Sequence, residues 1–495
     1  MTPLGPRPAP PPAHRVLLAG AAGNFVEWYE FGVYGSFATV LAAHFFTPGP
    51  GTGRAGAGPL LAVYASFAVA FFLRPAGALL FGRLGDRIGR RPTLVLVVGL
   101  MTLATTLIGL LPTRATAGAA APWLLTALRA LQGLSAGGEF GGAVALMTEQ
   151  APPGRRGRYG AWQSFTVALG LLAGAGTAAL LASLLPPQAL MAWGWRIAFL
   201  LALPLGLTAL HLRRNLPDPL PAAVPAPPPD TADPRSGRGH GALLPAAFGP
   251  AAFGPAASGP APSGPARVAP AASGPAPVAP ATAGAAAGAP VPGPGHGGAV
   301  SVGRVLVLGV GRIMGWSAAG YTFLVVLPSY LQATLGASLR EALAATVLAN
   351  LGFAAAILPA GILSDRVGRR PVMLGGALAV TLLALPLLHL LQDPAAPAPA
   401  RAAAVVGAGA AVGLLAGPGP AMLAETFPAH VRCTGLGVAY ALANALFSGC
   451  AGLVVTALTA ATGDSDVPAY YAAGTCALSA LALAGLRDGH RGALR

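Results

Sequence analysis

Apolar runs of about 20 residues recur along this chain, separated by short polar connections. As a helix, each run is long enough to cross a hydrocarbon layer about 30 Å thick. We therefore predict twelve membrane-spanning helices, six in each half of the chain. Their bounds are 15–44, 58–82, 93–112, 122–149, 160–185 and 194–212, followed by 303–333, 342–363, 371–392, 401–424, 434–461 and 467–486.

Two motifs occur once in each half. The stretch Gly82–Pro92 returns almost unchanged as Gly361–Pro371, at an offset of 279 residues. A second pattern has Glu, Pro and Arg at relative positions 0, 3 and 7, and it begins at Glu149 and again at Glu425, 276 residues later. Two nearly equal offsets indicate that one six-span unit has been duplicated.

The distribution of charge along the chain predicts its membrane topology. Only 9% of residues are charged, against roughly 25% in soluble domains, and the net charge of +15 comes from 30 arginines without a lysine. With both termini in the cytoplasm, about 22 arginines fall on cytoplasmic segments and three within spans, which follows the positive-inside rule. No nucleic acid partner is expected. Five arginines fall outside: Arg54, Arg114, Arg196, Arg340 and Arg401.

The segments around the two bundles have a different composition. Residues 1–14 and 487–495 are predicted to be cytoplasmic tails, and the bundles occupy 15–212 and 303–486. The connection 213–302 is rich in Pro, Ala and Gly, which break helices and supply no core side chains. We interpret it as a flexible cytoplasmic linker, and a docking site for a partner is the alternative.

The first span has one polar face. At 100° per residue, Asn24, Glu27, Glu30 and Tyr34 fall within an arc of roughly 120°. A charge at the bilayer centre costs on the order of 3 kcal/mol or more, so these acids must face a cavity or a cation. Glu27 and Glu30 are therefore candidates for proton or substrate handling, and a structural ion pair is the alternative.

The fourth span carries a matching polar face. Arg129, Gln132 and Glu139 share an arc of about 80°, so that one cation and one acid could meet the first span. Arg129 is a candidate for tuning the proton-carrying acid, or for holding helices together. Arg74 in the second span either lines the pathway or extends to the headgroups.

Further candidates lie in the second half and at the cytoplasmic ends. The substrate-pathway candidates, alongside Asn24, Tyr34, Arg74 and Gln132, are Arg312, Tyr321, Tyr440 and Asn444, with Trp316 beside them, although aromatic residues in spans also serve packing. A cytoplasmic ion-pair gate is predicted from the repeated motifs: Asp86, Arg87, Arg90, Glu149, Arg156, Asp365, Arg366, Arg369, Glu425 and Arg432. A loop that serves only the positive-inside rule is the alternative.

No metal or cofactor is expected. Cys433, Cys450 and Cys476 lie 17 and 26 residues apart, which matches no metal or redox spacing, and the eight histidines form no cluster. The sequence carries no Walker phosphate loop, so we expect an ion gradient and not ATP to supply the energy.

The repeated stretch resembles the signature loop of the major facilitator superfamily, which joins spans two and three and spans eight and nine. Arg129–Gly133 resembles the Arg-x-x-Gln-Gly motif that the superfamily places in span four and associates with proton coupling. Gly23–Phe31, Arg74–Gly77 and Gly137–Phe140 resemble the metabolite:proton symporter family. That family's permeases carry proline and betaine, α-ketoglutarate, citrate or shikimate. The chain departs from the family at Glu30, where an Asp is usual.

We therefore predict an all-α membrane protein of twelve helices in two pseudo-symmetric halves, a transporter and not an enzyme. Its expected function is proton-coupled uptake of a small polar metabolite, with an organic anion slightly ahead of a zwitterionic osmolyte. A proton-antiport exporter and a non-transporting sensor are the alternatives. A monomer in a bacterial cell membrane is expected, because the Arg-only composition, rich in Ala and Gly, is typical of a GC-rich genome.

Overall fold

The computed structural model describes residues 13–47, 56–137, 144, 147–149, 151–152, 154–214, 302–427, 432–486 and 488–489, without the side chains of 13–20, 85–86, 90, 302 and 433. Every regular element among them is a helix. The predicted linker lies outside the described residues except for its ends, and so do residues 1–12 and most of 487–495.

The helices of the first half follow the predicted spans, several of which are divided into consecutive segments. The bounds are α1 (Ala13–Ser36), α2 (Ala38–Leu41), η1 (Ala42–Phe46), α3 (Gly58–Ile88), α4 (Arg90–Leu110), α5 (Arg114–Ala117), α6 (Ala120–Ala136), α8 (Arg156–Leu184), α9 (Pro187–Ala189), η2 (Leu190–Gly194), α10 (Trp195–Leu200) and α11 (Ala202–Arg214).

The second half repeats this plan, and here too π-helical turns (η) interrupt long helices. The bounds are α12 (Val302–Tyr321), η3 (Thr322–Val326), α13 (Leu327–Ala333), α14 (Leu339–Val367), α15 (Arg369–Gln392), α16 (Ala398–Ala416), α17 (Gly419–Thr426), α18 (Arg432–Ala443), η5 (Asn444–Gly449), α19 (Ala451–Thr462) and α20 (Val467–Ala484).

Ten stretches of the described chain are long and apolar enough to cross a membrane. Two predicted spans are not among these ten stretches, and each absence can be explained. α1 carries the polar face with its two acids, and α6 has only 17 described residues of the fourth span. The remaining predicted spans each coincide with one of the ten stretches.

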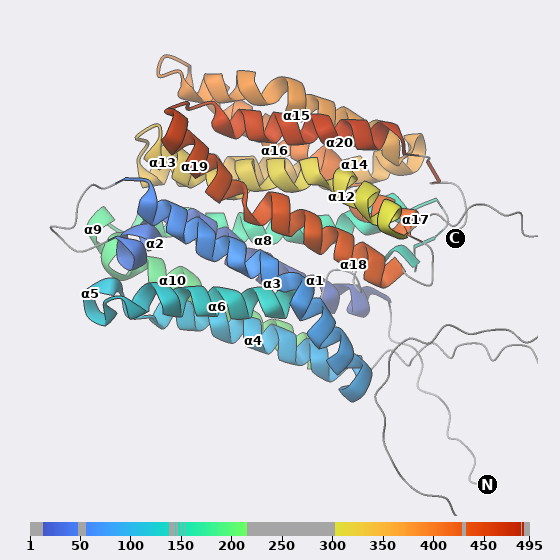
Figure 1. Ribbon diagram of the computed structural model, residues 1–495, viewed down its shortest axis with the longest axis horizontal. Coiled ribbons are helices and arrows are strands. Elements are labelled where there is room, and N and C mark those ends of the chain that lie inside the picture. Colours follow the sequence, from blue (N-terminus) through green and yellow to red (C-terminus); the bar gives the residue numbers. More distant parts are fainter. Residues whose placement is uncertain are drawn as a thin grey trace, which may run out of the picture. The chain divides into compact units, whose positions relative to one another are not determined.

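The two halves pack against each other along two pairs of spans. α8 of the first half packs along α14 of the second, and α3 packs along η5 and α19 (Figure 1). Within the first half, α1 packs along α8 and α3 packs along α6. The polar face of α1 is thereby surrounded by helices and not by lipid.

The repeated motif makes the same backbone turn in both halves. α3 continues to Ile88 and α14 to Val367, so a single glycine separates each from the next helix. Gly89 has φ 97° and Gly368 has φ 103°, backbone angles that residues other than glycine rarely adopt. The predicted loop of eleven residues is therefore a one-residue turn between two helices.

The backbones of α3 and α6 touch through glycines. A Cβ on Gly133 would lie 1.8 Å from the Ala70 carbonyl oxygen, and one on Gly77 would lie 1.8 Å from the Leu134 carbonyl oxygen. Arg74 is one turn from Gly77, and Arg129 is one turn from Gly133. This close approach therefore fixes how near the two intramembrane arginines come to α1.

We predict that Gly133→Ala destabilises the protein by about 1–3 kcal/mol, because the added methyl group forces α6 away from α3. The measurement is the melting temperature of purified protein in detergent. Gly99→Ala in α4 is the matched control, since a Cβ there meets nothing within 4 Å. Equal melting temperatures for the two variants would contradict the assigned packing.

Candidate functional site

The first acid on α1 is held by an arginine from α3. Glu27 Oε1 accepts from Arg74 Nη2 at 2.8 Å, and the two side chains are 5% and 4% exposed. The Arg74 guanidinium also lies over aromatic rings, 4.4 Å from the centre of Phe71 and 5.9 Å from that of Trp28. Arg74 thus faces the interior and not the headgroups, and its role in the substrate pathway stays a prediction.

The second acid on α1 is reached from α6 through an amide. Gln132 Nε2 donates to Glu30 Oε2 at 3.3 Å and also to Thr105 Oγ1, while Gln132 Oε1 accepts from Arg129 Nη1 at 2.6 Å. Arg129 therefore binds Gln132, and Gln132 in turn binds Glu30. The second oxygen of Glu30 has no hydrogen-bond partner among the described residues.

A small cavity lies between the halves, next to the Glu27–Arg74 pair. Its walls come from α1, α8, α12, η3, α14, α18 and η5: Trp28, Val167, Leu171, Trp316, Ser317, Gly320, Tyr321, Leu324, Val325, Phe353, Tyr440 and Asn444. About 30 Å³ is open to the centres of water molecules, where one water needs roughly 10–15 Å³. The cavity in this conformation is too small for a metabolite.

Tyr321, Tyr440 and Asn444, which were predicted from the sequence, line this cavity together with Trp316. The Trp316 and Tyr440 rings lie 5.9 Å apart, and Asn444 stands at the start of the π-helical turn η5. Such turns are frequent at functional sites because they redirect side chains. The sequence pattern did not indicate Trp28 or the α8 wall as lining residues.

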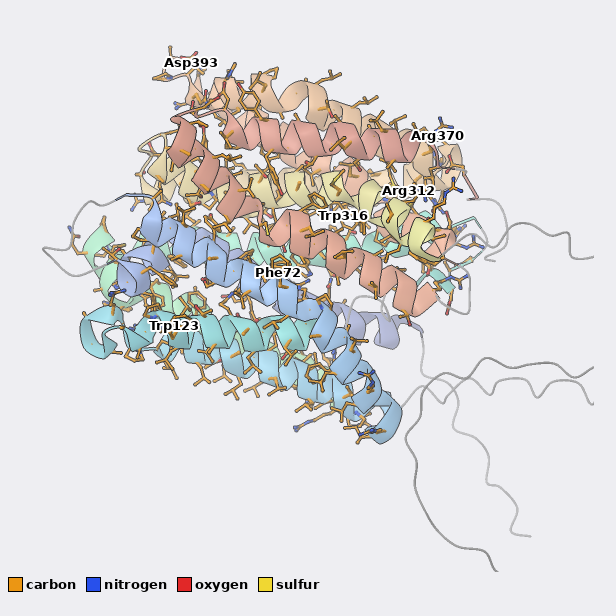
Figure 2. The ribbon with its side chains drawn as sticks, in the orientation of Figure 1. Phe72, Trp123, Arg312, Trp316, Arg370 and Asp393 are labelled. Carbon is orange, nitrogen blue, oxygen red and sulfur yellow. The ribbon has the colours of Figure 1, made fainter. Side chains whose placement is uncertain are left out.

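Other predicted pathway residues have partners away from the cavity. Asn24 donates to the Gln163 carbonyl at 3.2 Å and to Thr166 on α8, and the Tyr34 hydroxyl lies 2.7 Å from that of Ser66. Arg312 reaches Thr426 at 3.4 Å. Arg312 and Trp316 are one turn apart on α12 (Figure 2).

At one end of the bundle, the second copy of the repeated motif joins the two halves. Asp365 Oδ1 and Oδ2 accept from the backbone N–H groups of Gly157 and Arg158, at 2.7 and 2.9 Å. These donors belong to the first turn of α8, where a helix offers free N–H groups and the positive end of its dipole. Asp365 therefore clamps α14 to α8.

Arginine–glutamate pairs surround this contact. Arg369 pairs with Asp365 at 2.7 Å and with Glu425 at 3.0 Å, and Glu425 lies 3.7 Å from Arg156 of the first half. A second pair, Arg432–Glu149 at 2.8 Å, also joins the halves. The interface at this end therefore holds a charged network of Asp365, Arg369, Glu425 and Arg156 and, in addition, the Arg432–Glu149 pair.

One residue at this end was not predicted from the sequence. Asp488 Oδ1 accepts from the backbone N–H groups of Arg369 and Arg370, at 2.7 and 3.2 Å, and so caps the start of α15. Figure 2 shows Arg370 at this end of α15 and Asp393 at the other. Only the folded chain brings the C-terminal segment to this turn.

The first copy of the motif is described only in part. Arg87 is exposed, as is Arg366 at the same place in the second copy. The side chains of Asp86 and Arg90 lie outside the described residues, and so does Glu139. Their predicted roles stay predictions.

The opposite end joins the halves through mostly neutral bonds. Thr39 donates to Gln332 at 3.1 Å, Tyr64 bonds Ser329, and Arg340 donates to the Ala182 carbonyl at 3.1 Å. Contacts between described residues thus close both ends around the cavity.

One further pair joins α15 to the start of α20. His389 Nε2 lies 2.8 Å from Asp466 Oδ2, and this hydrogen bond holds the pKa of the Asp466 carboxyl below its usual range. Gln392 joins Asp466 to Tyr330 with bonds of 2.9 and 3.0 Å. His389 therefore links α15 to the start of α20, and Gln392 links α15 to α13.

Family models match the halves separately. One described as Sugar (and other) transporter matches residues 16–219, and one described as Major Facilitator Superfamily matches residues 305–493.

Curated relatives match almost the whole chain. The ectoine/proline transporter ProP of Corynebacterium glutamicum is 31% identical over 490 residues, covering 96% of this chain and 84% of the relative. The alpha-ketoglutarate permease of Escherichia coli is 31% identical, covering 89% and 86%. The citrate-proton symporter of Klebsiella pneumoniae is 28% identical, covering 92% and 87%.

Solved structures share the fold. A D-xylose-proton symporter superposes with a TM-score of 0.67 at 16% identity, covering 98% of this chain and all of the other. The xylose transporter XylE of E. coli, in a partially occluded inward-open conformation, gives 0.65 at 15% identity, covering 96% and 98%. The predicted fold is confirmed. With relatives above 30% identity over most of its length, this chain is a membrane transporter that belongs to the major facilitator superfamily.

Proposed function

We propose that this protein imports a small polar metabolite that carries a carboxylate, together with protons, by alternating access of a site between its halves. The observation that carries the proposal is the buried Glu27–Arg74 pair beside the aromatic cavity. The acid there can bind a proton, and the neighbouring cation can bind the carboxylate of a substrate. Relatives named as a citrate-proton symporter and a D-xylose-proton symporter support proton coupling.

The ion pair supplies a coupling mechanism. A proton that enters from outside neutralises Glu27 and leaves the Arg74 guanidinium to bind the substrate carboxylate. When the substrate leaves on the inside, Glu27 releases its proton and pairs with Arg74 again. Proton and substrate move together because either one alone leaves a buried charge without a partner, which is strongly unfavourable.

Glu30 and Arg129 form the second part of the proposed proton path. One oxygen of Glu30 is free to take a proton, and Gln132 links the other to Arg129. Glu139 stays a candidate on the same helix face from its spacing alone.

The aromatic walls favour a zwitterionic substrate. Trp28, Trp316, Tyr321 and Tyr440 offer ring faces to a weakly hydrated cationic group, while Arg74 serves the carboxylate. Relatives named for ectoine, proline and betaine transport support this class.

A mono- or dicarboxylate is the second candidate. Arg312 lies one turn from Trp316 on α12 and provides another buried cation near the cavity (Figure 2). The relative named as an alpha-ketoglutarate permease supports this reading.

We also propose a location, an oligomeric state and an orientation. The protein resides in the plasma membrane of a bacterium as a monomer, with both termini and the charged Asp365 network on the cytoplasmic side, as the arginine distribution requires. That network, with Glu149 and Arg432, forms the cytoplasmic gate.

Transport assays in proteoliposomes test the function. We expect labelled proline or glycine betaine to accumulate when the outside is acidic, and a protonophore to abolish the accumulation. Accumulation of α-ketoglutarate or citrate alone would select the second candidate. Gradient-driven efflux would indicate an antiporter, and binding without accumulation a sensor; either result would contradict symport.

We predict that Glu27→Gln abolishes gradient-driven accumulation while substrate exchange at equal pH persists, because a neutral residue mimics the protonated acid permanently. Initial uptake rates with and without a pH gradient provide the measurement. Glu341→Gln at the exposed start of α14 is the control. Normal accumulation by Glu27→Gln would remove Glu27 from the mechanism.

We predict that Asp365→Asn shifts the population toward the inward-open state by about tenfold or more. Hydrogen bonds to charged groups contribute about 1.5–3 kcal/mol each, and this change weakens two of them together with the Arg369 pair. Spin-label distances between α8 and α14 at this end measure the shift.

Asp393→Asn is the matched control for the gate. This carboxylate binds only the nearby Ala395 N–H in the described structure, at the other end of α15. Identical distance distributions for Asp365→Asn and Asp393→Asn would contradict the gate.

A further inference from the structure

Phe31 on α1 touches both intramembrane arginines. Its ring centre lies 4.9 Å from the Arg74 guanidinium carbon and also 4.9 Å from that of Arg129. The side chain is 2% exposed and packs between Phe67 and Phe71, at 5.6 and 5.2 Å. One ring therefore joins the Glu27–Arg74 unit to the Glu30–Gln132–Arg129 unit.

The two arginines differ in how their charge is compensated. Arg74 has a carboxylate oxygen at 2.8 Å. Arg129, which is 1% exposed, has no ion pair with a described carboxylate, and its Nε and Nη2 atoms have no described hydrogen-bond partner. A buried guanidinium in this situation needs another source of negative potential.

Ring faces supply that potential. The Arg129 guanidinium carbon lies 4.2 Å from the Tyr34 ring centre and 4.8 Å from that of Phe67, in addition to Phe31. The face of an aromatic ring is negative and attracts a cation, most strongly where water is excluded. Because rings hold Arg129, Glu30 is not needed as its counter-ion.

We propose that Phe31 is a positioning residue for proton coupling: its ring holds Arg129 away from Glu30 and links the position of Arg129 to that of Arg74. This inference rests on the proposed proton symport. Without the ring, Arg129 moves onto the Glu30 carboxylate, stabilises its ionised form, and makes protonation harder. Protonation of Glu27 frees Arg74 to move. Without the ring, that movement no longer changes the position of Arg129 or the protonation of Glu30.

The charged or titratable groups around this ring come from five helices. Glu27, Glu30 and Tyr34 lie on α1, Arg74 on α3, Arg129 on α6, Tyr321 on α12 and Tyr440 on α18. Ordinary phenols titrate near pH 10 and guanidinium groups above pH 12, so the two carboxylates are the groups around this ring that proton coupling can use.

The test compares the pH dependence of uptake for Phe31→Leu, Phe31→Tyr and the wild type. We expect the midpoint for Phe31→Leu to move at least about half a pH unit to the acid side, about a threefold weaker proton affinity. Phe31→Tyr retains a ring and should keep the wild-type midpoint. Phe37→Leu, which removes a fully buried ring between α1 and α2 with no described cation contact, is the control for packing.

A second series keeps the volume of the ring. Phenylalanines with one, two and three fluorines at position 31 weaken the negative ring face stepwise with little change in packing, so the midpoint should move to the acid side stepwise. If Phe31→Leu does not fold, this series tests whether the ring face of Phe31 positions Arg129.

The outcomes separate this inference from the proposed function. If wild-type uptake does not respond to a pH gradient, both are wrong. If wild-type uptake responds but the fluorinated series keeps one midpoint, or Phe37→Leu moves the midpoint equally, Phe31 is only a packing residue and this inference alone is wrong.

Discussion

The ion pair between Glu27 and Arg74 is the constraint on which the rest of the structure depends. Burying either charge alone within a membrane is unfavourable by several kcal/mol, so the two must meet. Meeting requires α1 and α3 to lie together, and the glycine contact between α3 and α6 then brings Arg129 to the same place. A hydrophobic pair would serve stability as well or better. The charges are therefore better explained by exchange of partners during transport.

The duplication provides two similar scaffolds with different contents. Gly89 and Gly368 make the same turn, so the backbone plan is shared. The acid–arginine pair beside the cavity lies in the first half, whereas the second half contributes Trp316, Tyr321 and Tyr440 to the cavity. A site between such halves can respond to protons from one wall while the other wall recognises the substrate.

The sequence predicted the helices and the polar faces well, because the period of a helix and the cost of buried charge leave few alternatives. It could not predict which arginine meets which acid. Arg129 was the expected partner from its spacing, yet Arg74 holds Glu27 and Arg129 reaches Glu30 through Gln132. Partner choice depends on how closely helices approach, as at Gly133. The contact of Asp488 with the start of α15 depends on the tertiary path of the chain and leaves no local pattern.

The two ends of the bundle differ in what must break for the site to open. The end with Asp365 is closed by carboxylates that bind backbone N–H groups and arginines, and charge-assisted bonds are roughly twice as strong as neutral ones. The other end is closed by Thr39, Tyr64 and a single arginine bonded to a carbonyl. Opening the Asp365 end therefore costs more than opening the other end. With that end on the cytoplasmic side, as proposed above, opening toward the inside is the harder step.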